Sequence, residues 1–452
     1  MTDTMNVLFI SLGCDKNLVD SERMLGSLAR RGYGFTNERE LADIAIVNTC
    51  CFINDAKEES IQAILEVAEL KKTGRLQFLI VTGCLAQRYQ EEIHAEIEEV
   101  DAVLGTAATD CLADVLDDVR AGRGRNCFPD LNGVSQTVSD RRYLTTGGHY
   151  AHLKIAEGCD KHCTYCIIPQ IRGRYRSVPV ETLLAEAEQL AADGVKELIL
   201  VAQETTLYGV DLYGKKSLPL LLRKLCGIEG LKWIRILYCY PEEITDELIE
   251  TIKSEEKICH YLDIPIQHAS DSILGRMGRK TSRKQLQEMI EKLRREIPDI
   301  CLRTTLITGF PGETQADYET LYRFVNEMEF DRLGVFAYSP EEGTPAAEME
   351  GQIPEEVKQA RREELMELQQ AVAFDRAEEI AVEGPVLDVF VEGWLAKEEV
   401  YVTRTYKDAP DVDGLLFLHA DRELMSGDFV RAKVTGFHEY DLTGEIYDEF
   451  TK

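Results

Sequence analysis

The sequence lacks any long hydrophobic run, and no apolar stretch reaches the roughly 18 residues that a membrane-spanning helix needs. Its first residues also lack the positive flank and the apolar core of a secretory signal. These absences favour a cytoplasmic protein with no membrane partner. With 452 residues, of which 44% are hydrophobic and 29% charged, the chain has a globular composition, and its length predicts two to four domains.

Positive charge is scarce. Lys and Arg number 51 against 81 Asp and Glu, which gives a net charge of −30. A surface this acidic excludes uniform binding of phosphate groups, although a local basic patch stays open.

Cysteine, in contrast, is plentiful, with 13 residues. In a reducing cytoplasm an odd number argues against a disulfide framework and favours metal or redox chemistry. A single free cysteine is often only a small core residue. The spacing of the cysteines must therefore separate ligands from packing residues.

Residues 1–125 alternate short apolar runs with amphipathic helical patterns. This alternation predicts an α/β domain with a doubly wound parallel sheet. The expected strands cover residues 7–10, 44–47, 78–81 and 102–104, and the expected helices cover 18–31, 57–72, 87–97 and 111–119. Residues 126–148 are polar and Gly-rich, which predicts a linker.

Residues 149–379 repeat the alternation in six longer strand–helix units, which predicts a partial β/α barrel of the TIM type. The expected strands cover residues 151–156, 197–201, 233–237, 261–264, 301–307 and 332–337, and a charged helix is expected over 354–380. Residues 380–452 predict a small antiparallel β-barrel. Its five expected strands cover residues 386–390, 399–405, 414–418, 428–437 and 442–449.

The strongest motif directly follows the first strand of the predicted barrel. Cys159, Cys163 and Cys166 form a C-x3-C-x2-C run. Three thiolates on one short loop can hold three irons of a cubane cluster and leave the fourth iron open to a small molecule. A zinc site is the alternative, but structural zinc usually takes four ligands, and His162 lies between two cysteines where its reach is poor.

This motif resembles the radical S-adenosylmethionine (SAM) enzymes. The resemblance implies a 4Fe-4S cluster that binds SAM and cleaves it to a 5′-deoxyadenosyl radical, which removes a hydrogen from an unactivated carbon. It also implies cofactor contacts at Glu204, which follows the second strand, and at Gly309, Gly312 and Glu313 in a Gly-rich turn. Both short motifs also fit ordinary turns. No catalytic side chain is expected beyond the cluster ligands.

A second group of cysteines is dispersed. Cys14, Cys50 and Cys84 each lie three residues or so beyond an expected strand, with separations of 36 and 34 residues. In a doubly wound sheet the carboxyl ends of such strands share the ligand-binding edge. The three side chains are therefore expected to converge on one site.

The whole chain resembles the methylthiotransferases, which combine a three-cysteine domain, a radical SAM domain and a C-terminal TRAM barrel. The resemblance implies two 4Fe-4S clusters, with Cys14, Cys50 and Cys84 holding an auxiliary cluster that handles the sulfur. It also implies domains over residues 1–125, 149–379 and 380–452, with the linker over 126–148. The source of the inserted sulfur and the electron donor stay open.

Members of this family modify either a tRNA adenosine or an aspartate of small-subunit ribosomal protein S twelve. Residues 380–452 hold 7 Lys and Arg against 16 Asp and Glu. Such an acidic barrel suits a basic protein and repels RNA, so direct nucleic-acid binding is not expected. The segments 11–22, 238–242 and 337–344 also resemble the aspartate-modifying branch, RimO, although Asp15 stands where that branch suggests proline.

The sequence therefore predicts methylthiolation of the aspartate β-carbon in that ribosomal protein. A tRNA methylthiotransferase and a non-catalytic metal- or cluster-binding protein are the alternatives. Four further features have simpler interpretations: Cys51 as packing, Cys239 as core or substrate-facing, His268 as structural, and the run Arg172, Arg174 and Arg176 as a solvated loop or a holder of a carboxylate.

Overall fold

The N-terminal part of the chain folds around five parallel strands in the order β2-β1-β3-β4-β5. The structure is a computed structural model that describes residues 5–124, 126–133 and 141–447. The strands are β1 (Asn6–Ser11), β2 (Gly34–Phe35), β3 (Ile44–Thr49), β4 (Phe78–Gly83) and β5 (Ala102–Val103). The helices are α1 (Asp15–Arg30), α2 (Asn54–Thr73), α3 (Cys84–Glu96) and α4 (Leu112–Arg120).

Alternate residues of the sheet face two separate helical layers. Ala45 and Val47 pack with α2 and α3, whereas Ile44 and Ile46 pack with α1 and α4. Because both faces are covered, the middle of each long strand is apolar on both sides, and the predicted doubly wound sheet is confirmed.

Two strand ends differ from the prediction. β3 and β4 run on to Thr49 and Gly83, so Cys50 and Cys84 follow their strands directly and not three residues later. The polar residues at these strand ends conceal the pairing, because an apolar run signals only the buried part of a strand. The two-residue strand β2 was not predicted, since it is too short to show a period.

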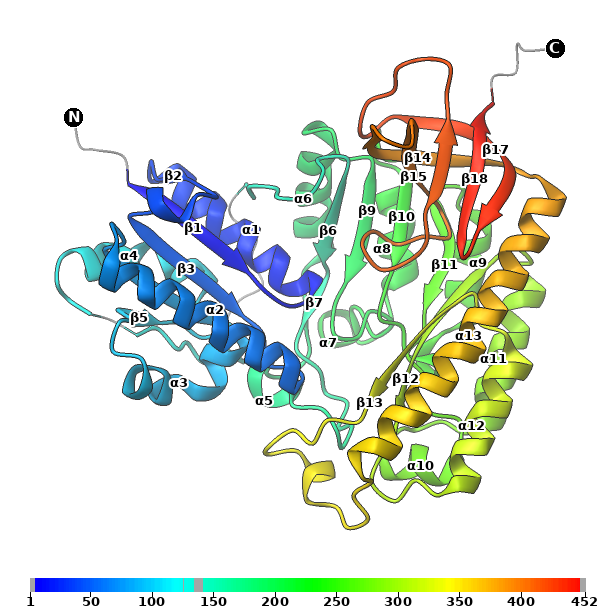
Figure 1. Cartoon of the computed structure of the whole chain (residues 1–452), viewed down its shortest axis with the longest axis horizontal. Coiled ribbons are helices and arrows are strands. Elements are labelled where there is room, and N and C mark those ends of the chain that lie inside the picture. Colours follow the sequence, from blue (N-terminus) through cyan, green and yellow to red (C-terminus); the bar gives the residue numbers. More distant parts are fainter. Residues whose placement is uncertain (1–4, 125, 134–140, 448–452) are drawn as a thin grey trace.

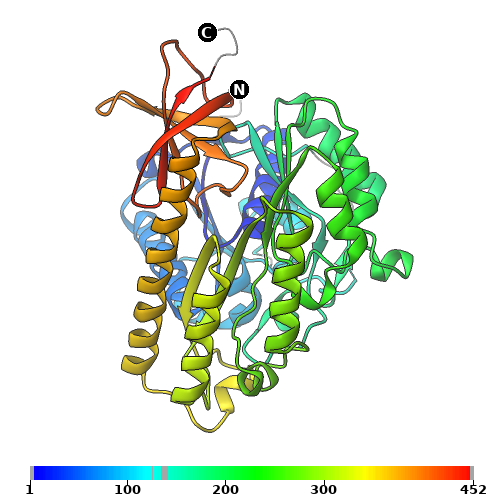
Figure 2. The ribbon, with the colours of Figure 1, turned by 90° about the vertical axis from the view of Figure 1, so that its right-hand side faces the viewer.

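The central sheet has six parallel strands in the order β13-β12-β11-β10-β9-β6. They are β6 (Tyr150–Lys154), β9 (Glu197–Val201), β10 (Trp233–Ile236), β11 (Ile258–Asp263), β12 (Cys301–Thr308) and β13 (Arg332–Ala337). The order starts with β13 and ends with β6, so the sheet is open and the predicted partial barrel is confirmed. Helices line its outer side (Figure 2). These are α6 (Val180–Ala192), α8 (Leu218–Cys226), α9 (Asp246–Ser254), α11 (Arg283–Glu296) and α12 (Gln315–Met328).

Shorter elements connect this framework, and one long helix runs beside it. The short ones are β7 (Ala156–Glu157), α5 (Ile168–Arg172), β8 (Arg176–Ser177), α7 (Val210–Tyr213) and α10 (Asp271–Arg276). The long helix α13 (Glu355–Glu383) packs along β13 and leads to the C-terminal barrel (Figure 2).

The C-terminal barrel is closed, in the order β14-β15-β16-β18-β17. Its strands are β14 (Val386–Leu395), β15 (Val400–Thr405), β16 (Leu416–His419), β17 (Phe429–His438) and β18 (Asp441–Ile446). The pair β16–β18 is parallel, so the barrel is mixed and not purely antiparallel as predicted. Hydrophobic patterns predict strands but not their partners. The last residues of the expected strand 442–449 lie outside the described residues.

The C-terminal barrel covers the end of the central sheet at which the strands begin. Phe390 packs with Tyr150 and Trp233, which lie at the starts of β6 and β10. The Glu197 carboxylate accepts hydrogen bonds from Arg235 at 2.8 Å and from Arg404 of β15 at 2.7 Å. The barrel therefore lies at the end opposite to the carboxyl ends of the strands (Figure 1).

Tyr143 and Thr145, near the end of the predicted linker, pack against α1. The Tyr143 N–H donates to the Glu22 carbonyl oxygen, and the Thr145 N–H donates to the Glu22 carboxylate. Residues 134–140 of this expected segment lie outside the described residues. No helix in the described ranges is long and apolar enough to cross a membrane.

Candidate active site

The C-x3-C-x2-C run forms a loop beyond the carboxyl end of β6. Gly158, with φ of +79°, starts the loop where a side chain would collide with the Arg174 carbonyl oxygen. Backbone hydrogen bonds hold the loop, from Cys159 N–H to Gly173 O at 3.2 Å and from Thr164 N–H to Met277 O at 3.0 Å. The loop is therefore attached to the central domain at two separate points.

Aromatic and cationic side chains cover this loop. The Tyr240 hydroxyl lies 3.4 Å from Cys163 Sγ, and the Arg279 guanidinium lies 4.2 Å from the centre of the Tyr240 ring. Burial raises the pKa of the Cys159 and Cys166 thiols to about 12. These thiols therefore stay protonated until a metal displaces the proton.

Glu204 lies just beyond β9 and is fully buried. Its Oε1 accepts hydrogen bonds from the backbone and the hydroxyl of Thr206, whereas Oε2 has no partner among the described residues. Burial raises the pKa of Glu204 to about 7, and the carboxylate is close enough to influence the Cys159 thiol. A buried carboxylate oxygen without a donor fits an incoming ammonium group, such as the amino group of SAM.

The Gly-rich turn after β12 is stabilised from within. The Glu313 carboxylate accepts hydrogen bonds from Gly309 N–H at 2.9 Å and from Arg361 at 2.6 Å. Gly309 and Gly312 have φ of +69° and +82°, as a tight turn requires. These contacts give Glu313 a role in the turn, and contact of Gly309, Gly312 or Glu313 with a cofactor stays a prediction. His268 lies beside this turn, because its Nε2 is 3.4 Å from a Glu313 carboxylate oxygen, and its Nδ1 accepts from Ser270 N–H at 2.9 Å.

The dispersed cysteines come together at the carboxyl edge of the N-terminal sheet. Cys14, Cys50 and Cys84 follow β1, β3 and β4, which surround the point where the strand order reverses. Gly13, with φ of +92°, lies so close to Cys50 that an added Cβ would be 3.0 Å from Cys50 Sγ. Burial and the nearby Cys84 raise the pKa of the Cys50 thiol to about 11.

Asn17 connects the loops of this second group. Its Nδ2 donates to Leu12 O and Thr49 O, both at 2.9 Å, and its Oδ1 lies 3.8 Å from Cys84 Sγ. One amide thus links the backbone before Cys14, the backbone before Cys50 and the thiol of Cys84.

Within the described residues, no three His, Cys, Asp or Glu side chains converge as ligands of a single metal ion. A cubane cluster offers a separate iron to each thiolate, so its ligands need not converge on one point. Neighbouring cysteines without ligand spacing are in the core. Cys51 packs in the N-terminal core, and Cys239 is buried in the central core with its sulfur 3.5 Å from the Thr205 hydroxyl.

One sequence motif contacts the surroundings of both cysteine groups. Tyr240 lies beside Cys163, whereas the hydroxyl of Tyr238 donates to Asp15 at 3.2 Å, next to Cys14. Lys16 Nζ lies 3.3 Å from the centre of the Tyr238 ring, and Tyr238 has a φ of +59°. Asp15 therefore takes part in the contact between the two domains, which sequence spacing did not reveal.

The basic run after the C-x3-C-x2-C loop is only partly solvated, because Arg174 is exposed whereas Arg172 is buried. Arg172 is 2% exposed, and its Nη2 lies 3.4 Å from Cys84 Sγ of the other domain. Arg176 instead donates to the carbonyl oxygens of Arg174 and Arg172. The sequence identified these arginines as notable but did not reveal that one of them connects the two cysteine groups.

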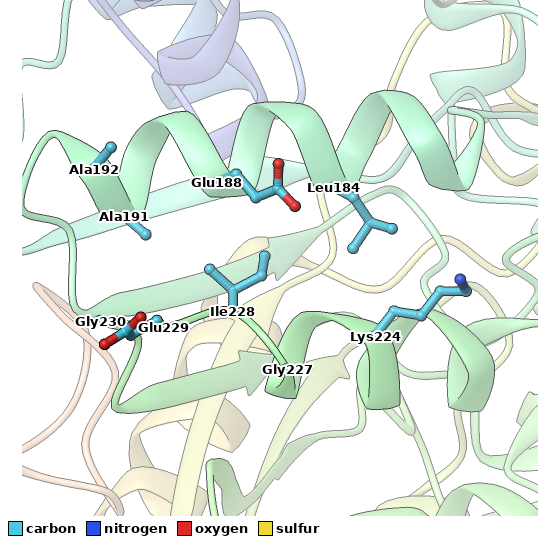
Figure 3. A pocket seen from close by; sticks show the side chains of 9 residues that line it. All are labelled: Leu184, Glu188, Ala191, Ala192, Lys224, Gly227, Ile228, Glu229 and Gly230. Atoms are coloured by element: carbon cyan, nitrogen blue, oxygen red, sulfur yellow. The ribbon is translucent and has the colours of Figure 1, made fainter.

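A groove on the outside of the barrel lies apart from this site (Figure 3). It runs between α6 and α8, and Leu184 and Ile228 point into it. Its charged lining residues are Glu188, Lys224 and Glu229, and it contains none of the cysteines. The cysteine groups therefore remain the candidate site.

Three family descriptions match the chain. "Uncharacterized protein family UPF0004" matches residues 6–105, "Radical SAM superfamily" matches 153–325 and "TRAM domain" matches 384–446. Among curated proteins, "Ribosomal protein uS12 methylthiotransferase RimO" from Lachnoclostridium phytofermentans is 63% identical, with 97% of this chain and 99% of that protein covered. The protein of the same description from Thermoanaerobacter sp. is 48% identical over the same shares.

Among solved structures, the radical SAM methyltransferase TsrM from Kitasatospora setae, with cobalamin and an iron–sulfur cluster bound, has a similar fold. The TM-score is 0.58 at 14% identity, with 76% of this chain and 77% of that chain covered. At this identity the likeness concerns the fold alone.

Proposed function

This chain belongs to the RimO family of ribosomal protein uS12 methylthiotransferases, and from this premise we propose that it replaces a hydrogen on the β-carbon of a uS12 aspartate with a methylthio group. The observation that supports this function most is the buried contact between Arg172, six residues after Cys166 of the local group, and Cys84 of the dispersed group. Since the β-carbon is unactivated, removal of its hydrogen calls for radical chemistry supplied by a cofactor.

The radical SAM domain implies SAM and a 4Fe-4S cluster, and the donor groups of this chain fit both. Cys159, Cys163 and Cys166 would hold three irons, and Glu204 would receive the SAM amino group. Cys14, Cys50 and Cys84 would hold a second 4Fe-4S cluster. When bound, SAM and the first cluster would supply the chemistry that removes the hydrogen, and the second cluster would handle the sulfur.

The protein's own residues exclude water from this site. Tyr240 covers Cys163, and Arg279 and Lys161 lie 4.2 and 4.9 Å from the centre of its ring. Lys161 also forms an ion pair with Glu243, which holds its ammonium group beside the Tyr240 ring. A closed site protects reactive species from side reactions with water.

A second interdomain contact fixes the distance between the cysteine groups. Glu341, beyond β13, accepts hydrogen bonds from Lys57 at 2.9 Å and Arg88 at 3.0 Å, both in the N-terminal domain. Its side chain is 3% exposed. Fixing two reacting centres in one geometry removes much of the entropic barrier to group transfer.

The acidic C-terminal barrel supports a role in attracting the substrate. Exposed acidic residues surround it, namely Asp388, Glu398, Glu399, Asp411, Asp421, Glu423, Glu439 and Glu445. Since the barrel lies at the end opposite to the cysteine loop, we propose that it steers a basic ribosomal protein over distance rather than contacting the reacting carbon.

The steering role is tested by removing two charges from the barrel. The variant Glu398→Gln with Glu399→Gln should bind uS12 more slowly, with a weaker dependence of the on-rate on salt. The control, Glu288→Gln with Glu291→Gln, removes two exposed charges from α11 and should leave the on-rate near the parent value. Equal slowing in both pairs would contradict a specific role of the barrel.

The reaction itself is tested by mass analysis of uS12 and of tRNA nucleosides from cells without this gene. We expect uS12 to lose about 46 Da, the difference between a methylthio group and a hydrogen, with tRNA unchanged. Loss of methylthioadenosine from tRNA, with uS12 unchanged, would overturn the proposed substrate. No change in either would overturn both substrates.

A further inference from the structure

Arg172 is a buried cation between the two cysteine groups. It ends α5, six residues after Cys166, and its side chain is 2% exposed. Its guanidinium enters the N-terminal domain and reaches Asp20, Asn17 and Cys84.

The two ends of this guanidinium have different partners. Nη1 donates to the carboxylates of Asp20 at 2.8 Å and Glu157 at 3.3 Å. Nη2 donates to the Asn17 amide oxygen and lies 3.4 Å from Cys84 Sγ. Carboxylates therefore neutralise one end, while the other end directs an N–H at a sulfur atom.

Lys154 completes the charge balance of this cluster. It pairs with the same two carboxylates, Asp20 and Glu157. Two cations and two anions are thus buried together, and each charge is paired, which limits the cost of desolvation. The negative charge of a Cys84 thiolate would be additional, and Arg172 is in contact with it.

The cysteines of the other group have different neighbours. The Cys159 sulfur accepts from the Lys161 backbone N–H at 3.4 Å, and Cys163 has the Tyr240 hydroxyl. Cys84 differs from them, because its sulfur accepts a hydrogen bond from the guanidinium of Arg172.

We propose that Arg172 is a positioning residue that holds the auxiliary cluster at Cys84 against the radical SAM domain and raises the reduction potential of that cluster. This inference rests on the proposed auxiliary cluster. Charge-assisted hydrogen bonds to a ligand sulfur stabilise the more negative, reduced state of a cluster, and such outer contacts orient the ligand as well.

The test measures the reduction potential of each cluster in the anaerobically reconstituted full chain by titration followed by electron paramagnetic resonance. A chain with Cys159→Ala, Cys163→Ala and Cys166→Ala assigns the auxiliary signal. Arg172→Gln should shift the auxiliary potential to a more negative value and leave the other cluster's potential unchanged. Arg172→Lys should give a smaller shift, because an ammonium keeps the charge but lacks the fork that reaches carboxylates and sulfur together.

Arg176→Gln is the matched control, since Arg176 belongs to the same basic run but donates to the backbone oxygens of Arg174 and Arg172. It should leave both potentials unchanged. An unshifted auxiliary potential in Arg172→Gln overturns the inference, as does an equal shift in Arg176→Gln.

Iron analysis distinguishes failure of the proposed function from failure of the role of Arg172. A parent chain that binds only about four irons, all of them lost with the C-x3-C-x2-C cysteines, would show that the auxiliary cluster does not exist. A parent chain with two clusters and an unshifted Arg172→Gln would overturn the role of Arg172 alone.

Discussion

The two cysteine groups have the same three ligand side chains but are assembled in opposite ways. Cys159, Cys163 and Cys166 lie within eight residues on one loop, whereas Cys14, Cys50 and Cys84 come from the ends of three strands of a sheet. The first group depends on one loop conformation. The second exists only when the whole N-terminal sheet has formed.

The supports of the two groups differ as well. Backbone hydrogen bonds at Gly173 and Met277 hold the local loop, whereas side chains, Asn17 and Arg172, connect the dispersed group. Damage to one group should therefore leave the other largely intact. The following changes test that independence.

The largest effects are expected from the cysteines themselves. Cys163→Ala and Cys84→Ala should each lose about four irons per chain, because each removes a ligand of a different cluster. Only Cys163→Ala should abolish formation of 5′-deoxyadenosine from SAM and a reductant. Iron analysis and chromatography of the products check both points. If Cys84→Ala also abolished 5′-deoxyadenosine, the groups would not be independent.

Substitution of two glycines should reduce iron binding at each cysteine group without removing a ligand. Gly13→Ala should reduce iron at the dispersed group, because the new Cβ would lie 2.8 Å from Cys50 Cβ at a φ of +92°. Gly158→Ala should reduce iron at the local loop, because its Cβ collides with the Arg174 carbonyl oxygen. Spectroscopy of each cluster after reconstitution distinguishes these losses.

Gly32→Ala is the control for the glycine pair. Its φ is +82°, yet nothing lies within 4 Å of an added Cβ. It should have only the backbone cost of about 1–2 kcal/mol and keep both clusters. Loss of a cluster in this variant would mean that general destabilisation, not local contact, controls iron binding.

Acid should lower the stability of the fold through the Glu197 contact between the central domain and the C-terminal barrel. This loss of stability should affect both cysteine groups alike. Burial by itself raises the pKa of Glu197, but Arg404 and Arg235 outweigh burial and lower it to about 2. Since the folded pKa lies below the unfolded one, the carboxylate stabilises the fold above about pH 4.5, by about 3 kcal/mol, and this is lost as the pH falls toward 2.

Glu197→Gln should therefore unfold more readily at neutral pH and show a flatter dependence of stability on pH below 4.5. Denaturant titrations at several pH values measure both. An unchanged slope in the variant would exclude Glu197 as the source of the acid sensitivity.

The smallest effect is expected at the Glu341 contact between the two domains. Glu341→Gln weakens hydrogen bonds from Lys57 and Arg88, which should cost about 1–3 kcal/mol and speed chelation of iron from the dispersed group. Thermal unfolding and the rate of iron loss to a chelator measure this. The exposed pair of Arg39 and Glu66 supplies a control, and Glu66→Gln should change neither quantity.

Much of the fold was predictable because apolar periodicity reports burial directly. The strands that contribute to the cores of the two sheets were found from runs such as 44–47 and 197–201. The strand ends at Thr49 and Gly83, the short strand β2 and the parallel pair β16–β18 were not. Each of these depends on which partner a backbone meets, which periodicity does not encode.

The candidate site also has parts that the sequence predicts and parts that it does not. The sequence by itself determined the C-x3-C-x2-C loop, since three ligands on eight residues need only local geometry, and it determined the acidic charge of the terminal barrel. Only the tertiary structure decided that Arg172 lies against Cys84, that Tyr238 and Tyr240 approach different cysteine groups, and that Glu313 accepts a hydrogen bond from Arg361. These contacts join residues far apart in the chain, and which such residues meet depends on how whole domains pack against each other.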